Sequence, residues 1–308
     1  MIRRLGLALA LTCLMLPAPR GASGGGLPVR VLIAEGKASL RLAGGGGLSL
    51  TDATGRQVML QRTGGAPVQL LRHARGVAVP EAGAALPLVL AWPGHGPTVA
   101  LDGQPYRGRL EVHGLADGLT VVNVVELEDY LQGVVKDEIP PAWPAEAAKA
   151  MAIAARTYAV FRLQRSPKAL FHVRATTASQ VYGGAGGEDP RTSAAVQATR
   201  GQILTFGGTP LPAFYHSCSG GATEDGPHVF GLEFDMVVGV KDDFSLGCPH
   251  ALWVERLERA HIERALAQAG HRVPGLRDIR PLARSRTGRI LRLVLEHLGE
   301  LRNGRALD

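Results

Sequence analysis

Apolar and polar residues alternate in short runs through the first third of the chain. Runs such as VRVLIAEG, ASLRLAGG and VMLQRTGG are separated by glycine-rich turn signals. Alternation with a period of two is typical of strands that bury one face, and closely spaced turns indicate many short strands. We therefore expect residues 27–125 to form a β-rich region.

The pattern changes after residue 126. An apolar, strand-like run leads to Glu138, and three prolines follow, of which Pro144 suits the first position of a helix. Alanine-rich residues 145–163 then have apolar positions at helical spacing, which predicts the main helix of the fold. The expected buried face of this helix consists of Ala147, Met151, Ala154, Tyr158 and Phe161.

Shorter elements complete the second half of the chain. Helical patterns cover residues 193–199 and 260–269, and a final strand covers residues 288–295. Residues 201–206 and 210–216 are expected to pair across a two-glycine turn. The prediction is an α+β fold, mainly β, with a central alanine-rich helix and two or three shorter helices. We expect residues 126–308 to carry the catalytic motifs, within one domain overall.

The N-terminus has the features of an export signal. Arg3 and Arg4 precede an apolar stretch too short to span a bilayer, and small residues follow at 21–23, so we expect residues 1–23 to be removed. Lipidation at Cys13 stays open as an alternative. The prediction is an exported protein of the periplasm, cell wall or extracellular space, peripheral to a membrane at most.

Charge changes this picture little. The net charge is +7, of which the leader carries three, and from Glu255 onward 12 arginines face 7 acids. This C-terminal excess suits either an anionic polymer such as cell wall or an ordinary solvated surface. No basic run is interleaved with aromatic residues, so we expect no nucleic-acid partner.

Two cysteines remain after removal of the leader, Cys218 and Cys248. An exported protein with two thiols most simply pairs them in a disulfide. Two alternatives stay open. Together with His216 and His250 the thiols could form a zinc site, although the one-residue gaps are tighter than usual. Cys218 could also be a nucleophile with either histidine as its base.

Three segments carry a resemblance to a known family: YLQGVVKDEIPPAWPAEAAKAMAIAARTYAV, TTASQVYGG and AFYHSCSGGATED. In this order they resemble the stage II sporulation protein D family, which includes amidase-enhancer proteins. The resemblance implies a lytic transglycosylase that acts on peptidoglycan glycan strands stripped of their stem peptides, with a cell-wall amidase as a partner. The alternative is a non-catalytic, glycan-binding amidase enhancer that stimulates an autolysin.

Glu138 aligns with the catalytic glutamate of that family. The resemblance implies that its carboxyl group protonates the glycosidic oxygen and then accepts the proton of the muramic C6 hydroxyl, leaving a 1,6-anhydro sugar. This chemistry differs from hydrolysis by paired carboxylates. The apolar neighbours Val134, Val135, Ile139 and Trp143 are expected to disfavour the charged carboxylate.

Asp137 is the neighbouring acid. In a strand-like segment its side chain would point to the face opposite Glu138.

Further residues are expected to contact the glycan. Arg156 could bind a carboxylate, or else form a structural ion pair. Gln180 and Tyr182 share one face of an extended SQVYGG segment, where they could contact sugar hydroxyls or belong to the core. The glycine-rich loop contributes the remaining candidates, which are His216, Ser217, Ser219, Gly220, Gly221 and Thr223.

No metal or cofactor is expected. Some members of the family have a zinc-binding Cys/His set before the QVY motif. In this chain the corresponding residues 174–179 lack both thiols and imidazoles, which leaves His172 alone.

Overall fold

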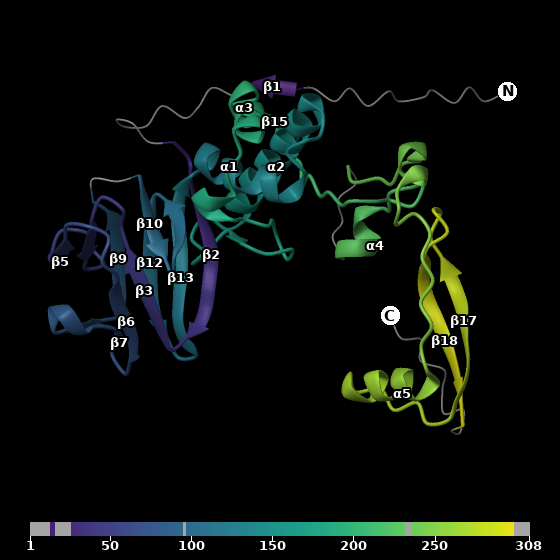
Figure 1. Ribbon diagram of the computed structural model, residues 1–308. Helices are drawn as coiled ribbons and strands as arrows, with labels where there is room; N and C mark the ends of the chain where they lie inside the picture. Colours follow the sequence, from purple (N-terminus) through teal and green to yellow (C-terminus); the bar gives the residue numbers. More distant parts are fainter. Residues whose placement is uncertain (1–12, 16–25, 95–96, 232–235, 299–308) are drawn as a thin grey trace. The chain divides into compact units, whose positions relative to one another are not determined.

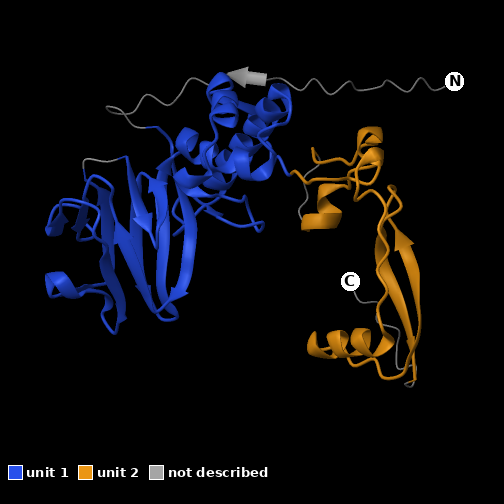
Figure 2. Cartoon of the chain, in the orientation of Figure 1, with its two compact units in different colours: residues 1–214 blue, residues 215–308 orange. Residues whose placement is uncertain are grey.

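The structure is a computed structural model that describes residues 13–15, 26–94, 97–231 and 236–298. The chain divides into two compact units, residues 1–214 (unit 1) and residues 215–308 (unit 2), shown in different colours in Figure 2. Apart from the short strand β1 (Cys13–Met15), the predicted leader lies outside the described residues. The α+β class predicted from the sequence is confirmed.

Two large sheets form most of unit 1. Their strands are β2 (Pro28–Lys37), β3 (Ser39–Ala43), β4 (Leu48–Thr51), β5 (Val58–Arg62), β6 (Val68–His73), β7 (Gly76–Val79), β8 (Ala84–Leu86), β9 (Leu88–Pro93), β10 (Thr98–Leu101), β11 (Gln104–Arg107), β12 (Arg109–Leu115), β13 (Gly118–Glu126) and β14 (Val173–Arg174). The seven-stranded sheet has the order β14-β2-β13-β12-β9-β4-β5, and the six-stranded sheet has the order β11-β10-β3-β6-β7-β8. The β14–β2 pair is parallel.

The inward-facing side chains of both sheets belong to one hydrophobic core, which the helices extend. Strand β13 is buried along nearly its whole length. Its buried side-chain amide, Asn123, donates hydrogen bonds to the carbonyl oxygens of Arg107 and Arg109 at 2.9 and 3.1 Å. A buried polar group needs such partners, and these two bonds satisfy the donors of the Asn123 amide.

Three helices gather at one end of the sheets, as Figure 1 shows. They are α1 (Leu127–Glu138), α2 (Ala145–Arg165) and α3 (Pro190–Ala198). The predicted main helix is therefore present. Its buried face, however, is displaced by one position from the predicted one. Of the predicted residues Tyr158 is buried, at 6% exposure, and the other buried apolar positions of the helix are small: Ala148, Ala152, Ala155 and Ala159. Alanine allows the backbones of packed helices to approach closely, whereas Met151 and Phe161 are only partly buried.

Helix α1 replaces the expected strand-like run before Glu138. The Glu126 side chain accepts hydrogen bonds from the backbone N–H groups of Glu128 and Asp129, at 2.8 and 3.3 Å, and so caps the helix. The helix continues through Val134 and Val135, whose side chains are fully buried. Packing of this face outweighs the strand propensity of the two valines.

The predicted hairpin after α3 is shorter than expected. Strand β15 (Gln202–Phe206) pairs with only two residues, β16 (Thr209–Pro210), and its other neighbour is β1. Proline at residue 210 lacks a backbone donor, which limits the ladder.

Unit 2 contains little regular structure. Its helices are α4 (Gly226–Phe230), which the sequence did not predict, and α5 (Arg259–Gln268). The predicted last strand corresponds to β18 (Ile290–His297), and its antiparallel partner β17 (Leu276–Arg284) was not foreseen. Within the part of the chain that the structure describes, no helix combines the length and apolar character needed to cross a membrane.

Candidate functional site

Glu138 is the last residue of α1. The helical backbone places Val134 and Val135, four and three residues earlier, on the same face as Glu138. The next residue, Ile139, is 5% exposed, and its N–H donates to the Val135 carbonyl oxygen at 3.1 Å. Three of the four expected apolar neighbours in the sequence are thus buried. The fourth, Trp143, is 54% exposed and so does not form part of that buried surrounding.

The Glu138 carboxylate accepts a hydrogen bond from the protein backbone. Its donor is the N–H of Val181, and Oε1 lies 2.8 Å from that nitrogen. Val181 is in the SQVYGG segment, 43 residues further along the chain. Two of the three segments singled out in the sequence therefore meet at this carboxylate.

The side chains on both sides of Val181 are buried framework. Gln180 is fully buried, accepts a hydrogen bond from the Tyr130 hydroxyl at 3.0 Å and donates to the Ala155 carbonyl oxygen at 3.3 Å. Tyr182 is 5% exposed, and its hydroxyl donates to Asn123 Oδ1 at 2.8 Å. Burial raises the pKa of Tyr182 well above its ordinary value of 10. Of the two roles considered for Gln180 and Tyr182, the structure shows the core role, which fixes the backbone that holds Glu138.

A glycine loop follows Tyr182 and encloses the end of α1. An added Cβ at Gly183 would overlap the Asp137 carboxylate, and one at Gly184, where φ is +59°, would overlap the backbone of β11. Beyond the loop, Glu188 forms a two-pronged ion pair with Arg107, at 2.5 and 2.7 Å. Close packing on both sides makes this loop a rigid support for the Val181 N–H.

Asp137 does not point to the face opposite Glu138, because the segment is helical. Successive side chains on a helix are about 100° apart, so the two acids diverge by about that angle. Asp137 accepts a hydrogen bond from Lys136 Nζ at 3.0 Å and packs against the glycine loop. Its position is that of a structural acid.

Arg156 forms the structural ion pair that the sequence left open. Its guanidinium contacts both Glu128 oxygens at 2.9 and 2.8 Å and also donates to the Val196 and Gln202 carbonyl oxygens. Arg156 is 1% exposed. Because the group is enclosed and its donors are used, it joins α1, α2, α3 and β15 and is not available to a glycan in this structure.

The HSCSGGAT loop belongs to unit 2, whereas Glu138 belongs to unit 1. Within this loop, Ser219 is 6% exposed and donates to Asp242 Oδ2 at 2.7 Å. Thr223 also bonds within unit 2, because its Oγ1 accepts a hydrogen bond from the Val240 N–H at 2.8 Å. The exposed members of the loop are His216, Ser217 and Gly220.

Cys218 and Cys248 form a disulfide with a Cα–Cα distance of 6.5 Å, which is the pairing that the cysteine count predicts. Sulfurs bonded to each other are neither thiolate ligands nor nucleophiles. The alternatives of a zinc site with His216 and His250, and of a catalytic Cys218, are therefore excluded in this structure.

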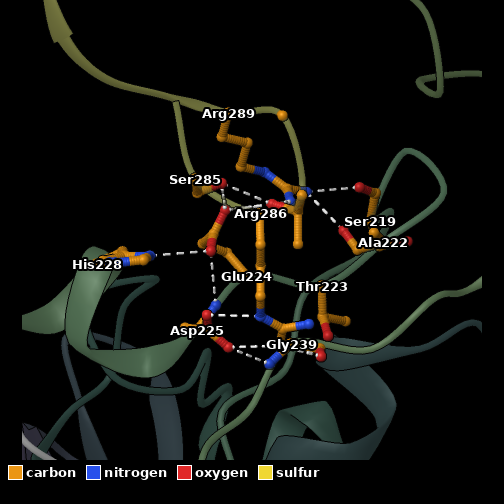
Figure 3. Close-up of polar contacts among 12 residues, drawn as sticks. Ser219, Ala222, Thr223, Glu224, Asp225, His228, Gly239, Ser285, Arg286 and Arg289 are labelled. Atoms are coloured by element: carbon orange, nitrogen blue, oxygen red, sulfur yellow. Dashed lines mark hydrogen bonds and ion pairs between the residues drawn. The ribbon is translucent and has the colours of Figure 1, made fainter. Parts of the chain in front are cut away.

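A polar cluster anchors the loop to the β17–β18 turn (Figure 3). Glu224 accepts hydrogen bonds from Ser285 Oγ, at 2.6 Å, and from Thr287 Oγ1, and it contacts His228 Nδ1 at 3.1 Å. Burial raises the pKa of Glu224, but these hydrogen bonds outweigh it and lower the value from 4.5 to about 2.

The neighbouring acid, Asp225, is also held in an ion pair within this cluster. Asp225 forms a two-pronged ion pair with Arg286 at 2.9 and 2.6 Å, and the Arg286 hydrogen bond lowers the pKa of Asp225. Ligand atoms of Glu224, Asp225 and His228 lie within 4.8 Å of one another. Arg286 pairs with the Asp225 carboxylate and Arg289 Nη1 lies 3.7 Å from the Glu224 carboxylate, so positive charges already balance both acids.

Comparison with known proteins identifies the domain. Residues 116–206 match the family model described as SpoIID, Stage II sporulation protein. Residues 116–206 are thus similar to a SpoIID domain, and the match covers less than half of the chain. The match begins just before β13 and ends with β15, so it includes Glu138, Val181 and the buried framework around them.

Three curated relatives are similar to parts of this chain. The chain is 37% identical over 141 residues to an uncharacterized protein of Brachyspira hyodysenteriae, covering 46% of this chain and 38% of the relative. It is 37% identical over 112 residues to the amidase enhancer of Bacillus subtilis, covering 36% and 15%. It is 36% identical over 144 residues to the stage II sporulation protein D of Bacillus subtilis, covering 42% of each chain. The matches therefore span less than half of these relatives.

Several residues that hold Glu138 and the helices in place were not predicted from the sequence. The Val181 donor is a backbone group, which no residue type reveals. The Glu128–Arg156 pair joins positions 28 residues apart on two helices. One signal was available: the run GGAGG after Tyr182 indicates a close backbone approach, and the structure places it against the end of α1.

Proposed function

We propose that this chain is an exported lytic transglycosylase that cleaves peptidoglycan glycan strands, with Glu138 as general acid and then general base. The observation that carries the proposal is the contact between Glu138 Oε1 and the Val181 N–H. It fixes the orientation of one acid by a backbone donor inside the SpoIID match, and general acid–base catalysis requires such a positioned group.

In the proposed reaction, the Glu138 carboxyl group gives its proton to the glycosidic oxygen after N-acetylmuramic acid, and the bond from C1 to that oxygen breaks. The C6 hydroxyl oxygen of the same sugar then bonds to C1, and its proton passes to the Glu138 carboxylate. The products are a 1,6-anhydro end and a free sugar hydroxyl. The carboxyl group is regenerated, so one acid suffices and no water is consumed.

The decisive test is Glu138→Gln, which keeps the shape of the side chain and removes the acid. Incubated with peptide-stripped glycan strands, the wild-type chain should release anhydro-muramic products, detected by mass spectrometry. We expect the variant to be slower by at least about a hundredfold. Glu146→Gln, at an exposed acid on the first turn of α2, is the matched control and should keep full activity.

Asp137→Asn separates the two neighbouring acids. If Asp137→Asn abolished product formation while Glu138→Gln did not, the assignment of the catalytic acid would be wrong.

The second candidate function is that of a non-catalytic module that binds glycan and stimulates a cell-wall amidase. It is favoured by the 37% identity to a protein named amidase enhancer. It predicts no anhydro product from the wild-type chain, together with faster hydrolysis of peptidoglycan by an added amidase.

A further inference from the structure

The segment between α1 and α2 combines an exposed indole with a stiff backbone. The backbone N–H of Trp143 donates to the Pro140 carbonyl oxygen at 3.0 Å and closes a turn. Pro140, Pro141 and Pro144 each fix one backbone torsion. The turn is also held at both ends, since Ile139 is buried against α1 and the Ala147 N–H donates to the Pro144 carbonyl oxygen.

Trp143 is the most exposed aromatic side chain among the described residues of unit 1. It is 54% exposed, and the next most exposed, Phe206, is 44% exposed. The chain has only three tryptophans, and Trp92 in the same unit is partly buried with its indole N–H donating to Thr51. An exposed indole offers a ligand both a large apolar face and an N–H donor.

The ring lies close to Glu138 along the chain. The ends of a hydrogen-bonded turn are less than about 7 Å apart, and Pro140 is only two positions after Glu138, so the Cα atoms of Trp143 and Glu138 lie within about 15 Å. From Ile139 to Ala145 the segment contains no charged residue. An uncharged apolar surface suits the C–H face of a pyranose ring. The indole N–H can donate a hydrogen bond to a hydroxyl or amide oxygen of the sugar.

We propose that Trp143 is a stacking platform for a sugar ring of the glycan, at a subsite adjoining Glu138. The ligand class is a neutral N-acetylated hexosamine ring. Because the prolines fix the turn before binding, little conformational entropy is lost when the ring is covered. This inference rests on the proposed function for its substrate, but it concerns binding and not proton transfer.

Binding is measured in a Glu138→Gln background, where turnover is expected to be slowed by at least about a hundredfold. The probe is a soluble peptide-stripped oligosaccharide of alternating N-acetylglucosamine and N-acetylmuramic acid, titrated calorimetrically. We expect Trp143→Ala to weaken binding by about tenfold and Trp143→Phe, which keeps a stacking ring, by about threefold or less. Trp253→Ala, at a 76% exposed indole in unit 2, is the matched control and should bind like its parent.

Kinetics of the otherwise wild-type chain give a second readout. Trp143→Ala should raise KM by about tenfold and leave kcat within about twofold, because a platform away from the reacting atoms binds substrate and transition state alike. Unchanged affinity and unchanged KM in Trp143→Ala would overturn the platform while leaving catalysis by Glu138 standing. Binding that depends on Trp143 without any anhydro product would overturn the catalytic proposal and keep the platform.

Discussion

The two units of this chain are stabilised in different ways. Unit 1 encloses a continuous hydrophobic core shared by two sheets and the helices at their end. Among the described residues of unit 2, only two apolar side chains are buried, Val273 and Leu276, and sixteen large apolar side chains are exposed. Phe244, for example, is fully exposed.

Different forces must therefore hold the two units. In unit 1 the burial of apolar area contributes most of the stability. In unit 2 a disulfide joins Cys218 to Cys248, and the Glu224 cluster joins the glycine-rich loop to the β17–β18 turn. Because unit 2 buries so little apolar area, these cross-links carry an unusual share of its stability. The proposed catalytic acid lies in the unit with the core.

The largest expected effect comes from the buried ion pair that joins the helices of unit 1. Arg156→Met leaves the Glu128 carboxylate buried and unpaired, which should lower the free energy of unfolding of unit 1 by about 3–5 kcal/mol. Thermal denaturation followed by circular dichroism measures the loss. Arg191→Met, which removes the exposed pair with Asp189, is the control and should cost less than about 1 kcal/mol.

The double variant Glu128→Met/Arg156→Met should regain much of that stability, because no buried charge remains at this position. If Arg156→Met lowered the free energy of unfolding no more than the surface control does, the pair would not be buried inside unit 1.

The disulfide is expected to dominate unit 2. Cys218 and Cys248 are separated by 30 positions in the sequence. Replacing both by serine removes this cross-link and should lower the free energy of unfolding of unit 2 by about 3–4 kcal/mol. Hydrogen exchange resolved by peptide should show faster exchange throughout residues 215–298 and unchanged protection in β13 and α1. Equal loss of protection in both units would show that they do not depend on separate forces.

This contrast also explains what the sequence could predict. Strand alternation, the alanine-rich helix and the disulfide are visible because each follows a local pattern or a simple count. The face of α2 was predicted one position away, because the large residues Met151 and Phe161 were expected in the core, while close helix packing selects alanines. Unit 2 has almost no buried apolar face, so periodicity predicted neither β17 nor α4.

The site was predictable to a similar extent. The resemblance located Glu138, and the SpoIID match covers it. Residue type did not distinguish binding from framework at Gln180 and Tyr182, because amide and phenol groups serve either purpose until their partners are known. Long-range partners such as Asn123 and Val181 depend on how β13, α1 and the glycine loop pack together.

The smallest expected effect distinguishes the units by their response to acid. Each contains a carboxylate with a pKa lowered from 4.5 to about 2, Glu111 in unit 1 and Glu224 in unit 2. For Glu111, burial raises the pKa, but the nearby His113 imidazole, at 3.4 Å, and the Arg30 guanidinium, which donates two hydrogen bonds to the carboxylate, outweigh it. Because both folded-state values are lowered, each carboxylate contributes stability above pH 4.5 that is lost as the pH falls toward 2.

Unit 2 should open first on acidification, because it has little apolar burial to compensate for the loss at Glu224. Glu224→Gln should lower its stability at neutral pH by about 1–2 kcal/mol, since the hydrogen bonds to a charged group are weakened. The same variant should also flatten the pH dependence of unit 2 between 4.5 and 2, and Glu111→Gln should do so only for unit 1. Hydrogen exchange at a series of pH values measures both slopes. If unit 1 lost protection at a higher pH than unit 2, polar cross-links could not be the main force that holds unit 2.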